Sequence, residues 1–309
     1  MPPGLAEPRQ FTAGEGLAIR GEAAGEGMPI VLCHGITATR RYVVHGSRTL
    51  ERSGHFVVSY DARGHGESDP APVGQGYGYP ELVGDLESVV AATVGEGRFL
   101  FAGHSMGAHT AVAYALRHPG RVAGLVLIGP VYIPEQSASA ATYPRMSGIS
   151  RSGAVAGGTP AYWDGLADAL ERGGVDGFVD YIDRVQGIDP AWRDSVLRFT
   201  RERMLRHRHP GALVEALRQI PRSRPFEAME ELESLEVPSL VVASHDDADP
   251  GHPYEVALAY AERLPRARVI GEAPGQSPLA WQGGRLSREI AAFCAEPDVA
   301  TRLAKPPAQ

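Results

Sequence analysis

Short hydrophobic runs alternate with amphipathic stretches over the first 130 residues of the chain. The stretches 79–94 and 108–116 place hydrophobic residues at helical spacing, and each lies between two of the hydrophobic runs. Continuous hydrophobic runs of this kind are typical of strands that are buried on both faces. The runs lie at residues 30–33, 56–60, 99–102 and 122–128. Their alternation with helices predicts a mostly parallel sheet wrapped by helices on both faces.

The pattern changes between residues 131 and 226, where helical repeats replace the hydrophobic runs. Sheet-like runs then return, interleaved with helical repeats up to residue 294, and the tail 295–309 is expected to fray. We therefore predict a doubly wound α/β core built from residues 1–130 and 227–309. A helical cap is expected to be inserted into it over residues 131–226. The returning strands are expected at 238–243 and 267–270.

The composition is that of a globular protein able to bury a large core, with 309 residues of which 43% are hydrophobic and 22% charged. The net charge is −7 and the basic residues are scattered, so we do not expect nucleic acid as a partner. The N-terminus lacks a basic start followed by an apolar run, and no stretch reaches about 20 apolar residues. We therefore expect a cytoplasmic protein that does not contact membranes. Cys33 and Cys294 are interpreted as buried thiols rather than as a disulfide.

The sequence Gly103-His104-Ser105-Met106-Gly107 lies between a predicted strand and a predicted helix. A G-x-S-x-G motif indicates a nucleophile only where it joins a strand to a helix. There the two glycines let the strand and the helix approach each other in a sharp turn. The turn exposes the Ser105 hydroxyl at a helix N-terminus, where developing negative charge is stabilised. Ser105 is therefore the predicted nucleophile.

A second polar turn, residues 33–37, follows an earlier strand at the edge where open α/β sheets bind ligands. The backbone N–H groups of Ile36 and Met106 are expected to form an oxyanion hole there. His34 is expected in the substrate pocket, although a buried histidine bonded to nearby backbone explains it equally well.

Three motifs occur in order along the chain: H-G at residues 34–35, D-x-R-G-x-G-x-S at 61–68, and the G-H-S-M-G turn at 103–107. In this order and spacing they resemble the α/β-hydrolase fold family. The resemblance covers residues 28–130 and 237–294, on both sides of the expected cap. It implies an α/β-hydrolase core with chemistry that depends on a serine.

The resemblance also implies an acid after a late strand, where the family pattern G-x-x-D aligns with Asp247. Asp246 and Asp249 are alternatives, and capping of the following helix is a structural explanation for all three. The family histidine falls on Gln276, in the turn G-Q-S-P. Because glutamine cannot take a proton from Ser105, the usual relay is incomplete as written.

Three explanations of the glutamine remain open. Another histidine reaches the serine, with His252 the nearest by topology and His245, His207 and His209 behind it. Alternatively, the pocket performs a lyase, cyclase or isomerase step that needs the oxyanion hole but no serine nucleophile. The third possibility is an engineered or degenerate site that only binds its ligand. The acidic loop with its histidines matches no specific metal spacing, so no metal is predicted.

We expect hydrolysis of a small carboxylic ester, thioester or lactone, in which Ser105 attacks, Asp247 orients the base and His252 is the base. The rival class is a non-hydrolytic enzyme or ligand-binding protein with the same pocket. No cofactor is expected, because no phosphate-binding or dinucleotide motif follows the first strand. A homodimer is compatible with the sequence. The expected pocket residues are His34, Gln276 and Trp281, and aromatic residues of the cap (Tyr132, Tyr143, Tyr162 and Trp163) favour an apolar or aromatic substrate.

Overall fold

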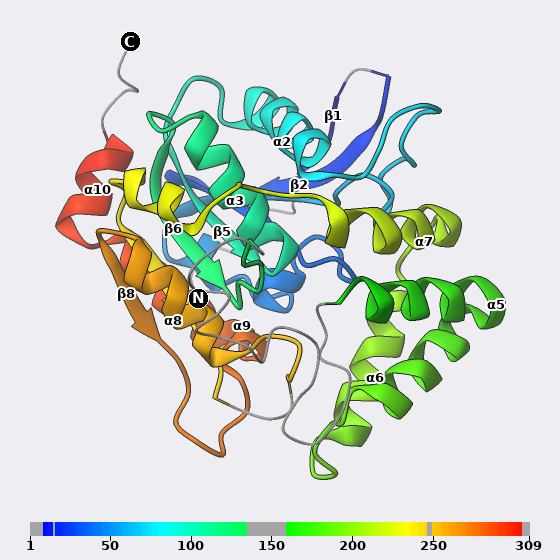
Figure 1. Ribbon diagram of the computed structural model, residues 1–309. Coiled ribbons are helices and arrows are strands. Elements are labelled where there is room, and N and C mark those ends of the chain that lie inside the picture. The colour runs from blue at the N-terminus through cyan, green and yellow to red at the C-terminus, as the bar shows by residue number, and fades with distance from the viewer. Residues whose placement is uncertain (1–8, 15, 135–158, 246–248, 305–309) are drawn as a thin grey trace, which may run out of the picture.

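The computed structural model describes residues 9–14, 16–134, 159–245 and 249–304 (Figure 1). The described strands form one eight-stranded sheet of order β1-β2-β4-β3-β5-β6-β7-β8. Every neighbouring pair from β4 to β8 in that order is parallel, whereas β2 pairs antiparallel with both β1 and β4. The strands are β1 (Arg9–Ala13), β2 (Ile19–Ala24), β3 (Met28–Cys33), β4 (His55–Tyr60), β5 (Phe99–His104), β6 (Val122–Ile128), β7 (Ser239–Val242) and β8 (Ala267–Ile270).

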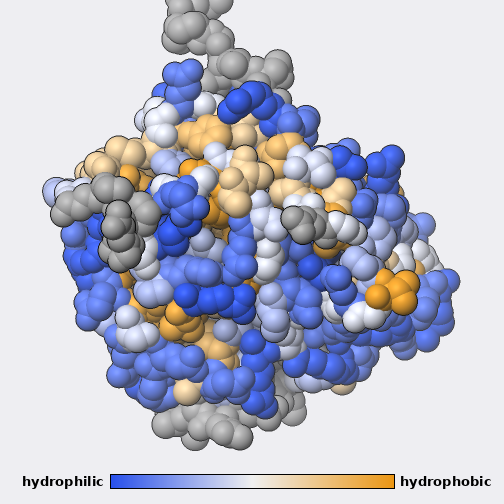
Figure 2. Space-filling model, turned by 90° about the horizontal axis from the view of Figure 1, so that it is seen from above, coloured by the Kyte–Doolittle hydropathy of each residue, from blue (hydrophilic) through white to orange (hydrophobic). Residues whose placement is uncertain are grey.

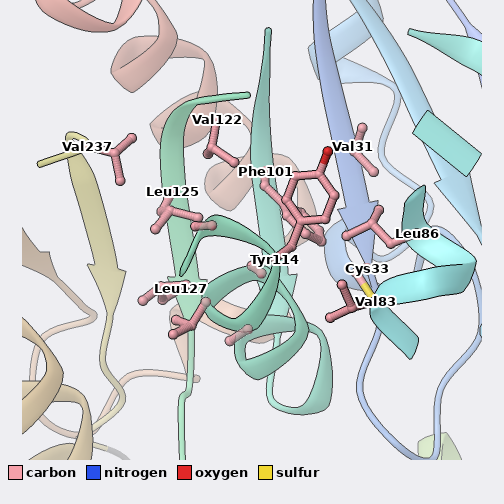
Figure 3. Close-up of a cluster of buried hydrophobic side chains, with 14 of the residues drawn as sticks. Val31, Cys33, Val83, Leu86, Phe101, Tyr114, Val122, Leu125, Leu127 and Val237 are labelled. Atoms are coloured by element: carbon pink, nitrogen blue, oxygen red, sulfur yellow. The ribbon is translucent and has the colours of Figure 1, made fainter. Parts of the chain in front are cut away.

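Helices cover both faces of this sheet, because consecutive residues of a buried strand point to opposite sides. On β3, Val31 packs into a cluster with residues of α2 (Tyr79–Thr93), α3 (Met106–Arg117) and α8 (Tyr254–Arg263). Figure 3 shows this cluster, with Tyr114 of α3 against Phe101 of β5. The neighbouring Ile30 and Leu32 face the other side. That side is packed by α1 (Thr49–Arg52), α9 (Gly283–Cys294) and α10 (Pro297–Ala304).

Between β6 and β7 the described residues form the three insertion helices, α5 (Pro160–Val185), α6 (Arg193–Met204) and α7 (Pro210–Gln219), followed by the short 3-10 turns η3 (Ile220–Arg222) and η4 (Met229–Ser234). The three insertion helices lie to one side of the sheet in Figure 1. The buried hydrophobic residues of α6, α7 and η3, and most of those of α5, share one hydrophobic cluster with Ile36 and Met106, which follow β3 and β5. The insertion helices therefore pack over the edge of the sheet where parallel strands end, and residues 135–158 of the expected cap lie outside the described residues.

Several elements were not predicted from the sequence. The hairpin of β1 and β2 extends the sheet beyond β4 by antiparallel pairing. The tail expected to fray contains α10, whose Val299 and Leu303 are buried against the sheet. Two further 3-10 turns, η1 (Tyr42–Val44) and η5 (Leu279–Trp281), pack near each other beside α9.

The surface seen in Figure 2 is largely hydrophilic, with hydrophobic residues gathered in separate patches. Within the described part of the chain, every helix is too short or too polar to cross a lipid bilayer.

Candidate active site

Ser105 lies in a strained turn between β5 and α3. Its backbone angles are φ 52° and ψ −114°, and it is one of three non-glycine residues with positive φ among those described. Such a conformation costs about 1–3 kcal/mol and persists only where its surroundings enforce it. The Ser105 N–H donates to the carbonyl of Ile128 on β6 (2.9 Å), and its carbonyl accepts from the His109 N–H (3.1 Å). The strained turn is therefore fixed from both sides, as the G-x-S-x-G motif requires.

The two glycines of the motif are required by close backbone contacts. A Cβ atom on Gly103 would lie 2.2 Å from the carbonyl oxygen of Gly107. A Cβ atom on Gly107 would lie 2.1 Å from the carbonyl oxygen of Cys33 at the end of β3. Both distances are far below van der Waals contact, so only glycine lets α3 begin this close to the sheet.

A cavity of about 870 Å³ lies above this turn. Ser105 is 8% exposed and lines it, as do Ile36, Met106 and Trp281. Most of the remaining wall is aliphatic or aromatic and comes from the insertion helices and the loops after β3 and β6. The volume and the apolar lining are typical of a pocket for a small organic molecule.

Of the four histidines considered as a base from the sequence, only His252 lines the cavity. Its Nδ1 lies 2.9 Å from a carboxylate oxygen of Asp249, three residues earlier in the same loop. Burial raises the pKa of Asp249, but the neighbouring His252, together with His104 and Arg203, lowers it to about 2. Asp249 is thus an ionised partner that holds the His252 ring. Asp246 and Asp247 lie outside the described residues.

Two predicted pocket residues, Gln276 and His34, and two candidate bases, His245 and His209, do not line the cavity. Gln276 is exposed and is not among the residues that line the cavity. His34 is 1% exposed, and both of its ring nitrogens bond to backbone groups. It is therefore a buried histidine that supports the backbone rather than a residue of the cavity wall. His245 is exposed and stacks on Tyr254, with ring centroids 3.7 Å apart. His209 precedes α7, outside the cavity wall.

His104, the residue before the predicted nucleophile, also lies at the site, and sequence reasoning missed it. Its ring centroid is 4.7 Å from that of His252. Burial and the neighbouring His252 lower the pKa of His104 to about 3, so its imidazole is neutral at physiological pH. His104, Asp249 and His252 bring ligand atoms within 4.8 Å of one another, so a metal ion fits there in principle. However, the Asp249 carboxylate already bonds to His252.

Three histidines hold three consecutive carbonyl groups of the turn after β3. The Gly35 carbonyl accepts from His34 Nδ1 (2.8 Å) and that of Thr37 from His207 Nε2 (3.3 Å), and His65 Nε2 lies 2.7 Å from the carbonyl oxygen of Ile36. Because C=O and N–H point in opposite directions within a trans peptide, each contact also orients the N–H of the next residue. His34 in this way fixes the direction of the Ile36 N–H. His207 comes from the insertion and ties it to this turn.

A buried pair, Tyr79 and His109, forms part of the cavity wall. His109 Nε2 accepts from the backbone N–H groups of Val131 (2.9 Å) and Tyr132 (3.1 Å), so the ring proton is on Nδ1. That proton is donated to the Tyr79 oxygen, 2.8 Å away. Tyr79 therefore keeps its own hydroxyl hydrogen for donation to another group.

Comparison with known proteins agrees with this architecture. The sequence model of the α/β hydrolase fold family matches residues 28–282, and the chain belongs to that family of enzymes. A putative non-heme haloperoxidase of Mycobacterium phage D29 is 34% identical over 117 residues, which cover 37% of this chain and 40% of the phage protein. The chain thus aligns with less than half the length of that relative.

Solved structures resemble the chain over nearly its whole length. A thermophilic esterase from Thermogutta terrifontis superposes with a TM-score of 0.70 at 20% identity, covering 93% of this chain and 98% of the esterase. An enol-lactonase from Burkholderia xenovorans LB400 gives a TM-score of 0.66 at 21% identity, covering 95% and 100% of the two chains. At this level of identity the likeness concerns the fold.

Proposed function

We propose that the protein hydrolyses small carboxylic esters, thioesters or lactones with Ser105 as the nucleophile and His252 as the general base. The observation that carries the proposal is the Asp249–His252 pair on the wall of the cavity that also contains the strained Ser105. In this proposal Asp249 orients the base, a role that the sequence analysis expected of Asp247. An esterase and an enol-lactonase among the structural relatives have the same class of reaction in their names.

In the proposed reaction, the Ser105 oxygen attacks the substrate carbonyl carbon while His252 Nε2 accepts the hydroxyl proton. The carbonyl oxygen becomes an oxyanion, stabilised by the N–H groups of Ile36 and Met106. The bond to the leaving alcohol or thiol then breaks, and His252 returns the proton to it. Water, deprotonated by His252, attacks the acyl-serine and releases the acid.

Asp249 has two tasks in this scheme. Its carboxylate accepts from His252 Nδ1–H, which leaves Nε2 with the lone pair that removes the serine proton. Its negative charge also stabilises the imidazolium that forms in the transition state. The proposed mechanism therefore needs no histidine at position 276, because the acid and the base both come from one loop after β7.

A fluorophosphonate probe tests the proposal. We expect stoichiometric labelling of Ser105, located by peptide mass spectrometry, and none in Ser105→Ala. His252→Gln should slow labelling by about 100-fold or more, since a general base contributes about 10²–10⁴-fold. Gln276→Ala is the matched control, because Gln276 is exposed outside the cavity, and its labelling rate should stay within about twofold of the parent rate.

Two results contradict the proposal. A folded parent protein that resists the probe lacks an activated serine, and the rival class, a non-hydrolytic enzyme or binding protein, then explains the cavity. If His252→Gln is labelled as fast as the parent, the base is not His252.

A further inference from the structure

Arg203, in the last turn of α6, lines the cavity. Its Nε atom is buried and has no hydrogen-bond partner among the described residues. The centre of its guanidinium lies 6.0 Å from the ring centroid of Tyr42, another residue of the cavity wall. A half-buried guanidinium with an unsatisfied donor is costly in free energy unless something pairs with it.

The other two arginines of the described cavity wall form ion pairs. Arg222 bonds to Asp164 (2.6 Å) and Arg224 bonds to Glu227 (2.9 Å). The Asp249 carboxylate is paired with His252. No described carboxylate lies within the 4.0 Å of an ion pair from Arg203, so its guanidinium has no ion-pair partner among the described residues.

The position of Arg203 relative to Ser105 is also informative. Its charge is one of those that lower the pKa of Asp249 and of His104, which places the guanidinium within electrostatic reach of the proposed catalytic groups. It is carried by an insertion helix, whereas Ser105 is at the sheet edge. Both residues line the same cavity, so one ligand of sufficient length can contact both.

We propose that Arg203 binds a carboxylate of the substrate, so that the protein acts on esters or lactones that carry a second, anionic group. A guanidinium matches a carboxylate through two parallel hydrogen bonds. One guanidinium without an ion-pair partner among the described residues, on a largely apolar wall that also carries the Asp249 carboxylate, favours a singly charged carboxylate over a doubly charged phosphate. The substrate class rests on the proposed ester hydrolysis, whereas the anion site rests on Arg203 alone.

Binding to Ser105→Ala tests the anion site without any turnover. The ligands are monomethyl and dimethyl esters of succinate, glutarate and adipate, which differ in one negative charge and scan the span of the cavity. By isothermal titration calorimetry, at least one monomethyl ester should bind about tenfold or more tightly than its dimethyl counterpart, the effect of one charge-assisted hydrogen bond. Adding Arg203→Gln should remove this preference.

The matched control is Arg198→Gln, which removes the same charge from the same helix at an exposed residue outside the cavity wall. It should keep the preference for the monomethyl ester. In Ser105-containing protein, 4-nitrophenyl hemiesters of the same acids should be preferred over neutral 4-nitrophenyl butyrate, and Arg203→Gln should lower that ratio of kcat/KM about tenfold or more.

Equal binding of the charged and neutral esters, or an unchanged preference in Arg203→Gln, overturns the anion site. Binding that follows the prediction without any ester turnover overturns the proposed hydrolysis and leaves the anion site standing. Loss of the preference in Arg198→Gln as well would mean that net charge, rather than Arg203, attracts the ligand.

Discussion

His34 shows how a single buried side chain sets the direction of a backbone N–H group beside the cavity. Its Nδ1 donates to the carbonyl of Gly35, and its Nε2 accepts from the N–H of Ala62 (2.9 Å). The first bond orients the Ile36 N–H, which we propose to be an oxyanion donor, and the second braces the loop after β4. The two ring nitrogens therefore have separate structural roles.

Asparagine and glutamine separate those roles, because the asparagine amide can replace Nδ1 and the glutamine amide can replace Nε2. His34→Asn and His34→Gln should each lose about 1–3 kcal/mol of unfolding free energy, the cost of one unsatisfied buried group. His34→Gln should also lower kcat about tenfold or more with little change in KM, whereas His34→Asn should keep most of kcat. Urea unfolding and ester kinetics measure the two effects, and equal kcat values in both variants would contradict the orienting role.

At this scale, the sequence predicted what local spacing encodes. Ser105 was found because its motif is contiguous and lies between a strand and a helix. The Asp249–His252 pair was within reach of the same reasoning, since its members are three residues apart, but the family pattern pointed to Asp247. Arg203 carries no sequence signal, because its lack of an ion-pair partner among the described residues depends on every other charge around the cavity.

The strained turn between β5 and α3 depends on Gly107, in the first turn of α3. Gly107→Ala should destabilise the protein by about 3 kcal/mol or more, because the new methyl group overlaps the Cys33 carbonyl and forces α3 away from β3. Gly84→Ala is the matched helical control. No atom lies within 4 Å of its added methyl group, so it should stabilise α2 by about 0.5–1 kcal/mol.

Chemical denaturation measures both variants, and fluorophosphonate labelling of Ser105 reports on the turn itself. Similar stability changes in Gly107→Ala and Gly84→Ala would show that the close approach of α3 to β3 is not a constraint.

The elements that sequence patterns missed share a physical cause. β1 and β2 carry few large hydrophobic side chains. β2 joins the sheet by pairing with β4, and β1 by pairing with β2, so neither depends on a hydrophobic run. α10 buries only Val299 and Leu303, too few for a periodic signal. The central strands β3 to β7, by contrast, were predicted because both of their faces are buried and most of their positions are hydrophobic.

Across the whole molecule, buried histidines make the fold sensitive to acid. Burial, followed by neighbouring charges, lowers the pKa values of His104, His109 and His207 to about 3. Hydrogen bonds agree for two of them, since His109 Nε2 and His207 Nδ1 each accept from a backbone N–H and so carry no proton. In the unfolded chain the same imidazoles titrate near pH 6.5.

Between pH 6.5 and pH 3, the unfolded chain therefore binds more protons than the folded one, and the unfolding free energy must fall as the pH falls. Each of the three histidines contributes a slope of about 1.4 kcal/mol per pH unit once the pH is well below 6.5. Asp249 adds to the loss only below about pH 4, because its own pKa shift lies between about 2 and the usual value of 3.8. Since whole domains are stable by about 5–15 kcal/mol, we expect constant stability from pH 7 to 8 and cooperative unfolding between about pH 6 and 4.

Urea unfolding at half-unit pH steps measures this slope. His109→Gln removes one titrating group while its amide oxygen can still accept from Val131 and Tyr132, so it should reduce the slope by about 1.4 kcal/mol per pH unit. The variant should therefore gain relative to the parent as the pH falls, even if it is less stable at pH 7. An unfolding free energy that stays flat from pH 7 to 5 would mean that these imidazoles accept protons in the folded state, and that the interior of the site is far more polar than its packing implies.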